Sequence, residues 1–245
     1  MSGLFITGTD TGIGKTFVSS LLIKILAEEG LRVTGMKPVA SGAKKVNGIL
    51  KNDDALFLMQ ASNVDSDYKI VNPYVFQPAV SPHLAAEQAG VEINFDKIKN
   101  CFEQLQIKSD VVVVEGVGGW YAPLSKYATV ADLAETLCIP IILVVGLRLG
   151  CLNHALLTAQ AIRQSGLPIA GWVANHIEKD FISEKENIKT LQHFLSDFPF
   201  IGSVPYDINH DQVTQADQNQ SNINTKEHLH HFNKKTLIKN FTGKK

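Results

Sequence analysis

Short apolar runs rich in β-branched residues alternate along the chain with longer stretches in which apolar residues recur every three or four positions. Runs without a polar face are typical of strands buried on both sides of a parallel sheet, whereas the longer spacing indicates amphipathic helices. The two clearest helices, Phe17–Glu28 and Asn153–Ser165, each precede a glycine that can end a helix. The predicted strands are Leu4–Thr7, Val33–Lys37, Val111–Glu115, Pro140–Val145, Ile169–Asn175 and Phe200–Val204.

The alternation of strand and helix predicts a single-domain α/β fold, with a doubly wound, mostly parallel sheet and helices on both faces, as in P-loop NTPases. Ligands bind such sheets beyond the carboxyl ends of the strands, so the residues that follow each strand are the candidates for function. We expect the catalytic domain to cover residues 1–210. Residues 211–245 form a polar tail, expected to be poorly ordered from 211 to 231, with an apolar patch at 236–241 that docks back.

The composition narrows the classes of function. The chain has 245 residues, 44% of them hydrophobic, and a formal net charge of −1. Such a chain lacks the charge for wrapping nucleic acid or coating an anionic membrane, and no run approaches the roughly 18 apolar residues of a membrane span. Three widely spaced cysteines argue against a disulfide framework or a zinc site. We therefore expect a cytoplasmic protein with no nucleic-acid or membrane partner.

A glycine-rich loop follows the first predicted strand and leads into a helix. It reads Gly8-Thr9-Asp10-Thr11-Gly12-Ile13-Gly14-Lys15-Thr16. Glycines let backbone N–H groups turn toward an anion, and the helix N-terminus adds partial positive charge. Lys15 is placed to reach the outer phosphates of ATP, and the Thr16 hydroxyl to ligate Mg²⁺. The alternative, a glycine-rich turn with a surface lysine, fits the strand–loop–helix context poorly.

The loop departs from two standard patterns. The strict G-x-x-x-x-G-K-[ST] spacing requires glycine at position 9, where the chain has Thr9, and Gly8 lies one position too early. The partitioning-ATPase form of the loop carries a second lysine at position 10, where the chain has Asp10.

Two acidic residues and a second lysine are candidate partners of this loop. Glu115 ends a buried strand, where a carboxylate needs a cationic partner. Asp54 opens an apolar helical pattern, and Mg²⁺ prefers such oxygen ligands, although Asp53 or Asp54 could instead cap the helix. Lys37 ends the second strand and could polarise a phosphoryl group, whereas a surface lysine is the ordinary alternative for it.

Taken together, the motifs resemble those of the dethiobiotin synthetase family. The segments that carry the resemblance include TGTDTGIGKT, GMKPVASG around Lys37, NDDAL at Asp54, VEGVGGWYAPL and LVVGLRLGCLNHALLTAQAI, in the family's order over about positions 4–206. Family members often carry glutamate where this chain has Gly12, which leaves the nucleotide preference open. The polar tail has little clear counterpart in the family.

The resemblance implies a reaction and its cofactors, ATP and Mg²⁺. The family's substrate is 7,8-diaminononanoate, one amine of which captures CO₂ as a carbamate. The carbamate attacks the γ-phosphate of ATP, and the second amine then closes a cyclic urea and expels phosphate. Such chemistry calls for fixed cations and positioning rather than a covalent nucleophile.

The resemblance also implies roles for individual residues. The catalytic residues would be Lys15, Lys37 and Thr11. The magnesium ligands would be Thr16, Asp54 and Glu115. Nucleotide and metal would contact Gly12, Ile13, Gly14, Lys15, Thr16, Phe17, Asp54, Glu115, Gly116, Val117, Gly118, Asn175, His176, Val204, Pro205 and Tyr206. The substrate would contact Thr11, Lys37, Ser41 and, through its far carboxylate, the helix start formed by Gly150, Cys151, Leu152 and Asn153. In the family this last site belongs to the partner subunit, which implies a homodimer with shared active sites.

Several alternatives stay open at this point. Trp120 and Tyr121 could wall the substrate site or simply pack, and Arg148 has no assigned role. A related amide ligase would normally carry a glutaminase domain, for which the chain is too short. A partitioning-type ATPase switch would need the second loop lysine and a membrane- or DNA-binding element, and neither is present in the sequence.

Overall fold

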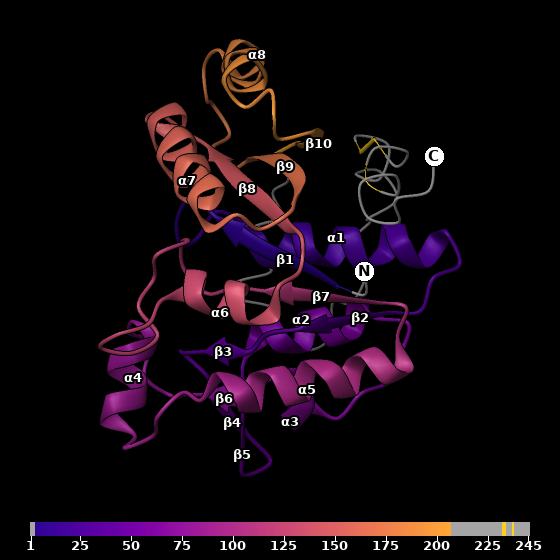
Figure 1. Cartoon of the computed structure of the whole chain (residues 1–245), viewed down its shortest axis with the longest axis vertical. Coiled ribbons are helices and arrows are strands. Elements are labelled where there is room, and N and C mark those ends of the chain that lie inside the picture. Colours follow the sequence, from indigo (N-terminus) through magenta and orange to yellow (C-terminus); the bar gives the residue numbers. More distant parts are fainter. Residues whose placement is uncertain (1–2, 207–231, 234–236, 238–245) are drawn as a thin grey trace.

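The computed structural model describes residues 3–206, 232, 233 and 237 (Figure 1). The predicted poorly ordered stretch, 211–231, therefore lies outside the described residues. Phe232 pairs with Gly202, and the Asn233 N–H donates to the carbonyl of Ile201 at 2.7 Å. Leu237, the described residue of the 236–241 patch, is fully buried in the core.

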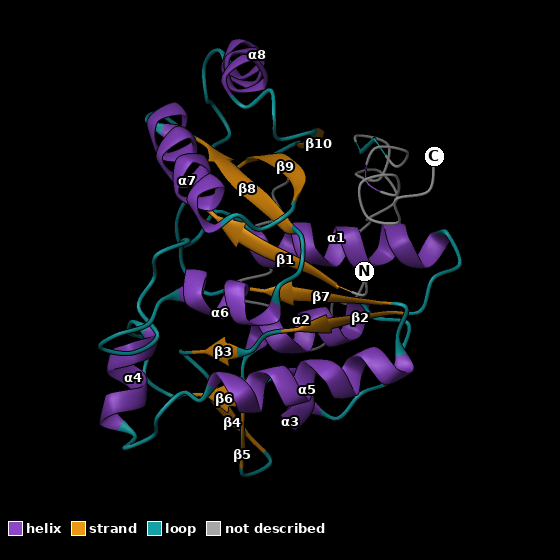
Figure 2. Cartoon of the chain, in the orientation of Figure 1, coloured by secondary structure: helices purple, strands orange, loops and turns teal. Residues whose placement is uncertain are grey.

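Six strands form one sheet, in the order β10-β9-β8-β1-β7-β2. Every neighbouring pair in this sheet is parallel, which confirms the predicted fold class (Figure 2). Valine, isoleucine and leucine fill the central strands on both faces, as burial between two helical layers requires. The strands are β1 (Gly3–Gly8), β2 (Val33–Met36), β7 (Val111–Glu115), β8 (Ile141–Leu147), β9 (Ile169–His176) and β10 (Phe200–Val204).

Helices cover both faces of the sheet. On one face, Leu4 and Ile6 of β1 pack in a cluster built largely from α1, and on the other, Phe5 packs in a cluster that includes α5, α6 and α7. The helices are α1 (Lys15–Glu28), α2 (Asp53–Ala61), α3 (Tyr68–Val71), α4 (Pro82–Gln88), α5 (Phe95–Lys108), α6 (Val130–Leu137), α7 (Cys151–Ser165) and α8 (Glu184–Phe194). No helix in the described part of the chain has the length and apolar character needed to cross a membrane.

Two small strand pairs lie outside the main sheet. β3 (Val39–Ala40) and β6 (Tyr74–Val75) pair in parallel, and β4 (Lys44–Val46) and β5 (Ile49–Lys51) form an antiparallel hairpin. β3 follows β2 along the chain, and both α2 and α3 contact β2.

Both predicted helices begin two residues earlier than the apolar pattern indicated. Gly14 caps α1 with φ +78°, and Gly150 caps α7 with φ +92°. A glycine accepts this left-handed conformation at no steric cost, so each helix starts directly after it. The loops after β1, β2, β7, β8, β9 and β10 thereby carry the predicted site residues to one edge of the sheet, as expected.

Candidate nucleotide and metal site

The phosphate loop is shaped by close packing as well as by backbone freedom. A Cβ on Gly8 would lie 2.5 Å from Cδ1 of Ile13, so a larger residue at this position would require the Ile13 side chain to shift. Gly12 and Gly14 have φ values of +73° and +78°. The N–H of Thr9 donates to the carbonyl of Val144 at 3.2 Å, which continues the pairing of β1 with β8. Glycine at position 8 thus leaves room for the side chains of Ile13 and Lys15, and Thr9, directly after the end of β1, still bonds to β8.

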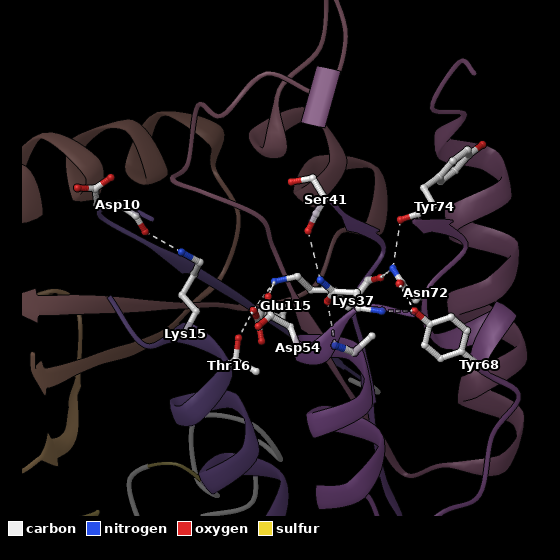
Figure 3. A network of polar contacts seen from close by, with 12 residues as sticks. Asp10, Lys15, Thr16, Lys37, Ser41, Asp54, Tyr68, Asn72, Tyr74 and Glu115 are labelled. Carbon is white, nitrogen blue, oxygen red and sulfur yellow. Dashed lines mark hydrogen bonds and ion pairs between the residues drawn. The ribbon is translucent and has the colours of Figure 1, made fainter. Parts of the chain in front are cut away.

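Lys15 turns back over this loop. Its ammonium donates to the carbonyl of Asp10 at 2.6 Å, and the residue is only 7% exposed (Figure 3). Burial, with the positive charge of Lys37 nearby, lowers the pKa of Lys15 to about 8. Lys37 is therefore close enough for its charge to act on the Lys15 ammonium.

Lys37, directly after β2, is the centre of a buried ionic cluster. Its ammonium lies 2.5 Å from Oε1 of Glu115 and 2.9 Å from Oδ2 of Asp54. The hydroxyl of Thr16 donates to the same Glu115 oxygen at 2.9 Å (Figure 3). The three predicted magnesium ligands therefore meet around one cation, and Lys37 lies on the same side of the sheet as the glycine loop.

Burial and ion pairing act in opposite directions on the charges of this cluster. Burial alone would lower the pKa of Lys37, but the carboxylates of Asp54 and Glu115 raise it above its ordinary value. Burial likewise opposes ionisation of Asp54, yet the Lys37 ammonium outweighs it and lowers the pKa of that carboxyl. Complete burial raises the pKa of Glu115 in spite of Lys37. A buried carboxylate of this kind depends on a nearby cation.

Asp54 is not a helix cap, and neither is Asp53. The side chain of Asn52 caps α2 by accepting from the N–H of Ala55 at 3.2 Å. Asp53 forms an exposed ion pair with Lys44 at 3.2 Å. The capping alternative for the two aspartates is therefore wrong, and Asp54 is left to face Lys37.

A polar network that the sequence did not reveal holds this segment in place. Asn72 donates to the carbonyl of Lys37 at 2.6 Å and accepts from the Tyr68 hydroxyl at 2.8 Å. Tyr68 in turn accepts from the N–H of Asn52, whose side-chain amide donates to the carbonyl of Ser41 at 3.3 Å (Figure 3). Sequence reasoning missed Asn72, because an asparagine in a loop carries no local signal of its distant partner.

The glycine turn after β7 lies against the phosphate loop. A Cβ on Gly119 would be 3.5 Å from the carbonyl of Gly8, and one on Gly118 would be 3.7 Å from Oγ1 of Thr11. Gly116 and Val117 therefore begin a turn that borders the same space. Trp120 is 3% exposed, so it packs in the core, whereas the neighbouring Tyr121 is exposed.

The predicted base-binding residues lie at the ends of β9 and β10. The side chain of Asn175 is buried and donates to the carbonyl of Ile13 at 2.7 Å, which ties β9 to the phosphate loop. Nδ1 of His176 is 2.6 Å from a carboxylate oxygen of Glu184 in α8. The remaining predicted members at this end are the buried Val204 and the partly exposed Pro205 and Tyr206.

The turn between β8 and α7 carries the predicted carboxylate site. The N–H of Cys151 donates to the carbonyl of Arg148 at 3.0 Å. Cys151 is buried, which fits a packing residue, and Asn153 is exposed. Arg148 reaches the phosphate loop instead of solvent, because its guanidinium forms an ion pair with Asp10.

The cluster around Lys37 fits a magnesium ion. Two carboxylates already hold the Lys37 ammonium, and the Thr16 hydroxyl is bonded to one of them. Mg²⁺ uses such oxygen ligands together with phosphate oxygens and water. Oε2 of Glu115 is buried and accepts no hydrogen bond from any residue that the structure describes. In the same residues no group of three His, Cys, Asp or Glu side chains is assembled, so the protein alone offers too few ligands for a closed metal site.

Comparison with known proteins agrees with this geometry. A family model described as an AAA domain matches residues 2–214. "ATP-dependent dethiobiotin synthetase BioD" of Nitrosospira multiformis is 46% identical over 209 residues, covering 85% of this chain and 90% of that protein. The protein of the same name from Xylella fastidiosa is 47% identical over 206 residues, covering 84% and 91%.

Solved structures confirm the fold from a greater distance. The MinD cell division protein of Aquifex aeolicus aligns with a TM-score of 0.58 at 14% identity, covering 100% of this chain and 98% of that one. A ParA family ATPase from Chlorobium tepidum aligns with a TM-score of 0.56 at 10% identity, covering 93% and 96%. At such identities the likeness concerns the fold alone. The relatives at 46–47% identity decide the family, and the chain belongs to the ATP-dependent dethiobiotin synthetases.

Proposed function

We propose that the protein is a Mg-ATP-dependent dethiobiotin synthetase that carboxylates 7,8-diaminononanoate with CO₂ and closes the ring, giving dethiobiotin, ADP and phosphate. One observation carries the proposal: the Lys37 ammonium, two carboxylates and the Thr16 hydroxyl gather beside a phosphate loop that contains a second buried lysine. The reaction needs this concentration of fixed cations, because it brings an anionic carbamate to an anionic phosphate.

The chemistry proceeds in three steps. An amine of the substrate forms an N–C bond to CO₂ and releases a proton, giving a carbamate; by family resemblance this is the amine on carbon seven. A carbamate oxygen then attacks the γ-phosphorus, and the bond to ADP breaks. The second amine attacks the carbonyl carbon of the mixed anhydride, phosphate leaves with the C–O bond electrons, and a further proton is released as the cyclic urea forms.

The two lysines supply the positive charge for these steps. Lys15 binds the outer phosphates of ATP and exchanges its hydrogen bond to Asp10 for one to a phosphate oxygen. Lys37 turns from its carboxylate partners to the carbamate and the γ-phosphate. Mg²⁺, held by Thr16, Asp54 and Glu115, supplies charge neutralisation for the phosphate oxygens when it is bound. Charges that are fixed before the reaction contribute most in a site sheltered from water.

The substrate extends from the phosphate loop to a second subunit. Thr11 and Ser41 contact its diamine end, and the N–H groups at the start of α7, from Gly150 to Asn153, bind its far carboxylate. We propose that this helix start comes from the partner in a homodimer. The exposed apolar side chains of Leu149 (92%) and Leu157 (63%), next to and within α7, support such an interface.

The nucleotide base lies on the other side of the phosphate loop. Asn175, already fixed by its bond to Ile13, reads the base, and His176, Val204, Pro205 and Tyr206 complete its pocket. A partitioning-type ATPase switch is the second candidate, but no feature of the site favours it: position 10 carries an aspartate that pairs with Arg148 instead of a second lysine.

The test is diamine-dependent turnover. The purified protein is incubated with Mg-ATP and bicarbonate, with and without 7,8-diaminononanoate, and phosphate release and the mass of the product are measured. We expect phosphate release only with the diamine, together with a product of the mass of dethiobiotin. Lys37→Met should abolish both, whereas Lys45→Met, which removes an exposed lysine of β4, should leave them unchanged. Phosphate release that is indifferent to the diamine would support the ATPase switch instead.

A further inference from the structure

Arg148 joins two loops that the proposed function assigns to different ligands. Its guanidinium forms an ion pair with the carboxylate of Asp10 in the phosphate loop. Its own carbonyl accepts from the N–H of Cys151, in the first turn of α7, at 3.0 Å. One residue therefore connects the nucleotide site through its side chain and the carboxylate-binding turn through its backbone.

Asp10 is the counterpart of Arg148 in the phosphate loop. Its Oδ1 accepts from the N–H of Thr11 at 2.7 Å, and its backbone carbonyl accepts from the Lys15 ammonium at 2.6 Å. Asp10 thus holds the backbone at Thr11 and the side chain of Lys15 while its other carboxylate oxygen holds Arg148. A shift of Arg148 would therefore affect two of the three proposed catalytic residues, Thr11 and Lys15.

The charge of Asp10 explains why a cation is needed here. A carboxylate in a loop that receives phosphates repels them unless it is compensated. Burial disfavours ionisation of Asp10, but the hydrogen bond from Thr11 and the charge of Arg148 outweigh it and lower the pKa of the carboxyl. The carboxylate therefore stays charged and paired.

We propose that Arg148 is a positioning residue that couples the phosphate loop to the α7 turn of the same chain. Nucleotide in one active site and the substrate carboxylate that this turn binds for the partner's active site then each strengthen the binding of the other. The proposal rests on the proposed function, which places the two ligands at these two loops. Ordering of either loop by its ligand orders the other through the ion pair, and the second ligand then loses less entropy on binding. Such coupling is reciprocal by thermodynamic necessity.

The side chains of Arg148 and Asp10 are 34% and 47% exposed, so water and salt partly screen the attraction between their charges. Exposed pairs of this kind contribute about 0.2–1 kcal/mol, which corresponds to a coupling factor of about 1.5–5. The chain offers a matched control: Arg163 pairs with Asp197, with side chains 30% and 49% exposed, at the far end of α7. A substitution at Arg163 removes an ion pair of similar exposure but changes neither the phosphate loop nor the α7 turn.

The experiment measures the affinity for a non-hydrolysable Mg-ATP analogue by calorimetry, with and without saturating 7,8-diaminononanoate, and takes the ratio of the two. Arg148→Met and Asp10→Asn should each lower this ratio about 1.5- to 5-fold, and the double variant should lower it no further. Arg148→Lys should retain most of the coupling, and Arg163→Met all of it. Affinity for the analogue alone reports whether each variant has kept a folded phosphate loop.

Two outcomes would overturn the inference alone: a wild-type ratio retained in Arg148→Met, or effects of Arg148→Met and Asp10→Asn that add independently. Both outcomes count only if the wild-type protein releases phosphate in response to the diamine. A wild type without diamine-dependent phosphate release overturns the proposed function, and the coupling with it. The two failures are therefore distinguished by the turnover of the unmodified protein.

Discussion

Replacing Lys37 by methionine should destabilise the fold strongly, and Mg²⁺ without nucleotide should reverse much of the loss. Methionine keeps most of the length of the lysine stem and removes the ammonium. Glu115, whose side chain is 1% exposed, would then lose its hydrogen-bonded cation, while Asp54, at 42% exposure, would be compensated by water. The cost therefore falls mainly on Glu115.

The magnitude follows from the burial of that one carboxylate. Removing one partner of a buried ion pair costs about 3–5 kcal/mol. The penalty has an upper bound, because Glu115 can take up a proton instead, which at pH 7 costs about 4 kcal/mol for a carboxyl of ordinary pKa. We expect a loss of about 3–4 kcal/mol, or about 6–16 °C in Tm for a chain of this size.

The assay is thermal unfolding in EDTA and in a series of MgCl₂ concentrations, with no nucleotide present. Lys45→Met serves as the control for loss of an exposed lysine. Ligand that binds only the folded state raises its stability, so Tm of Lys37→Met should climb with Mg²⁺ more steeply than that of the wild type, where the ammonium competes for the same oxygens. If Lys37→Met melts with the control in EDTA, or gains no more from Mg²⁺ than the control does, the idea that this lysine and a metal share one set of ligands is wrong.

Three further predictions concern residues around this cluster. Asn72→Ala should cost about 1–3 kcal/mol in urea unfolding, since it leaves the buried carbonyl of Lys37 without its donor; unchanged stability would show that water replaces the amide. Asp54→Asn should raise the Mg²⁺ concentration needed for phosphate release, while Asp53→Asn, which removes an exposed ion pair, should not. Equal effects of the two variants would contradict the assignment of Asp54 as a magnesium ligand. Gly8→Ala should weaken nucleotide binding in calorimetry, because the side chains of Ile13 and Lys15 must shift to make room for the added methyl, and wild-type affinity would refute the packing argument.

The sequence predicted the framework of the fold because its signals are local. A run such as Val111–Val114 can only be buried on both faces, and its neighbours along the chain say where it ends. The glycines at 14 and 150 likewise mark where helices start. The small strands β3 and β6 could not be predicted in this way, since each has two residues and depends on a partner far along the chain.

Within the site, too, local sequence signals identified some residues but not their partners. Lys37 and Glu115 were identifiable separately, because each ends a strand and all such ends meet at one edge of the sheet. That Asn72 would bond the Lys37 carbonyl, and that Asp10 would pair with Arg148 across 138 positions, could not be read from local spacing. Such pairs depend on the direction in which each side chain points, and the order of the strands does not determine that direction.

The phosphate loop shows why a failed pattern match was no obstacle. The standard expression asks for glycine at position 9. In this loop Gly8 leaves room for the side chains of Ile13 and Lys15, and Gly12 and Gly14 adopt the positive φ values of the turn. The partitioning form asks for lysine at position 10, and the chain instead places a carboxylate there, with Arg148 compensating it from another loop. The loop therefore keeps the geometry of anion binding but exchanges a cation of its own for one tied to α7. Replacing Arg148 should therefore weaken the dependence of nucleotide binding on the second substrate, whereas replacing Arg163, whose ion pair lies at the far end of α7, should not.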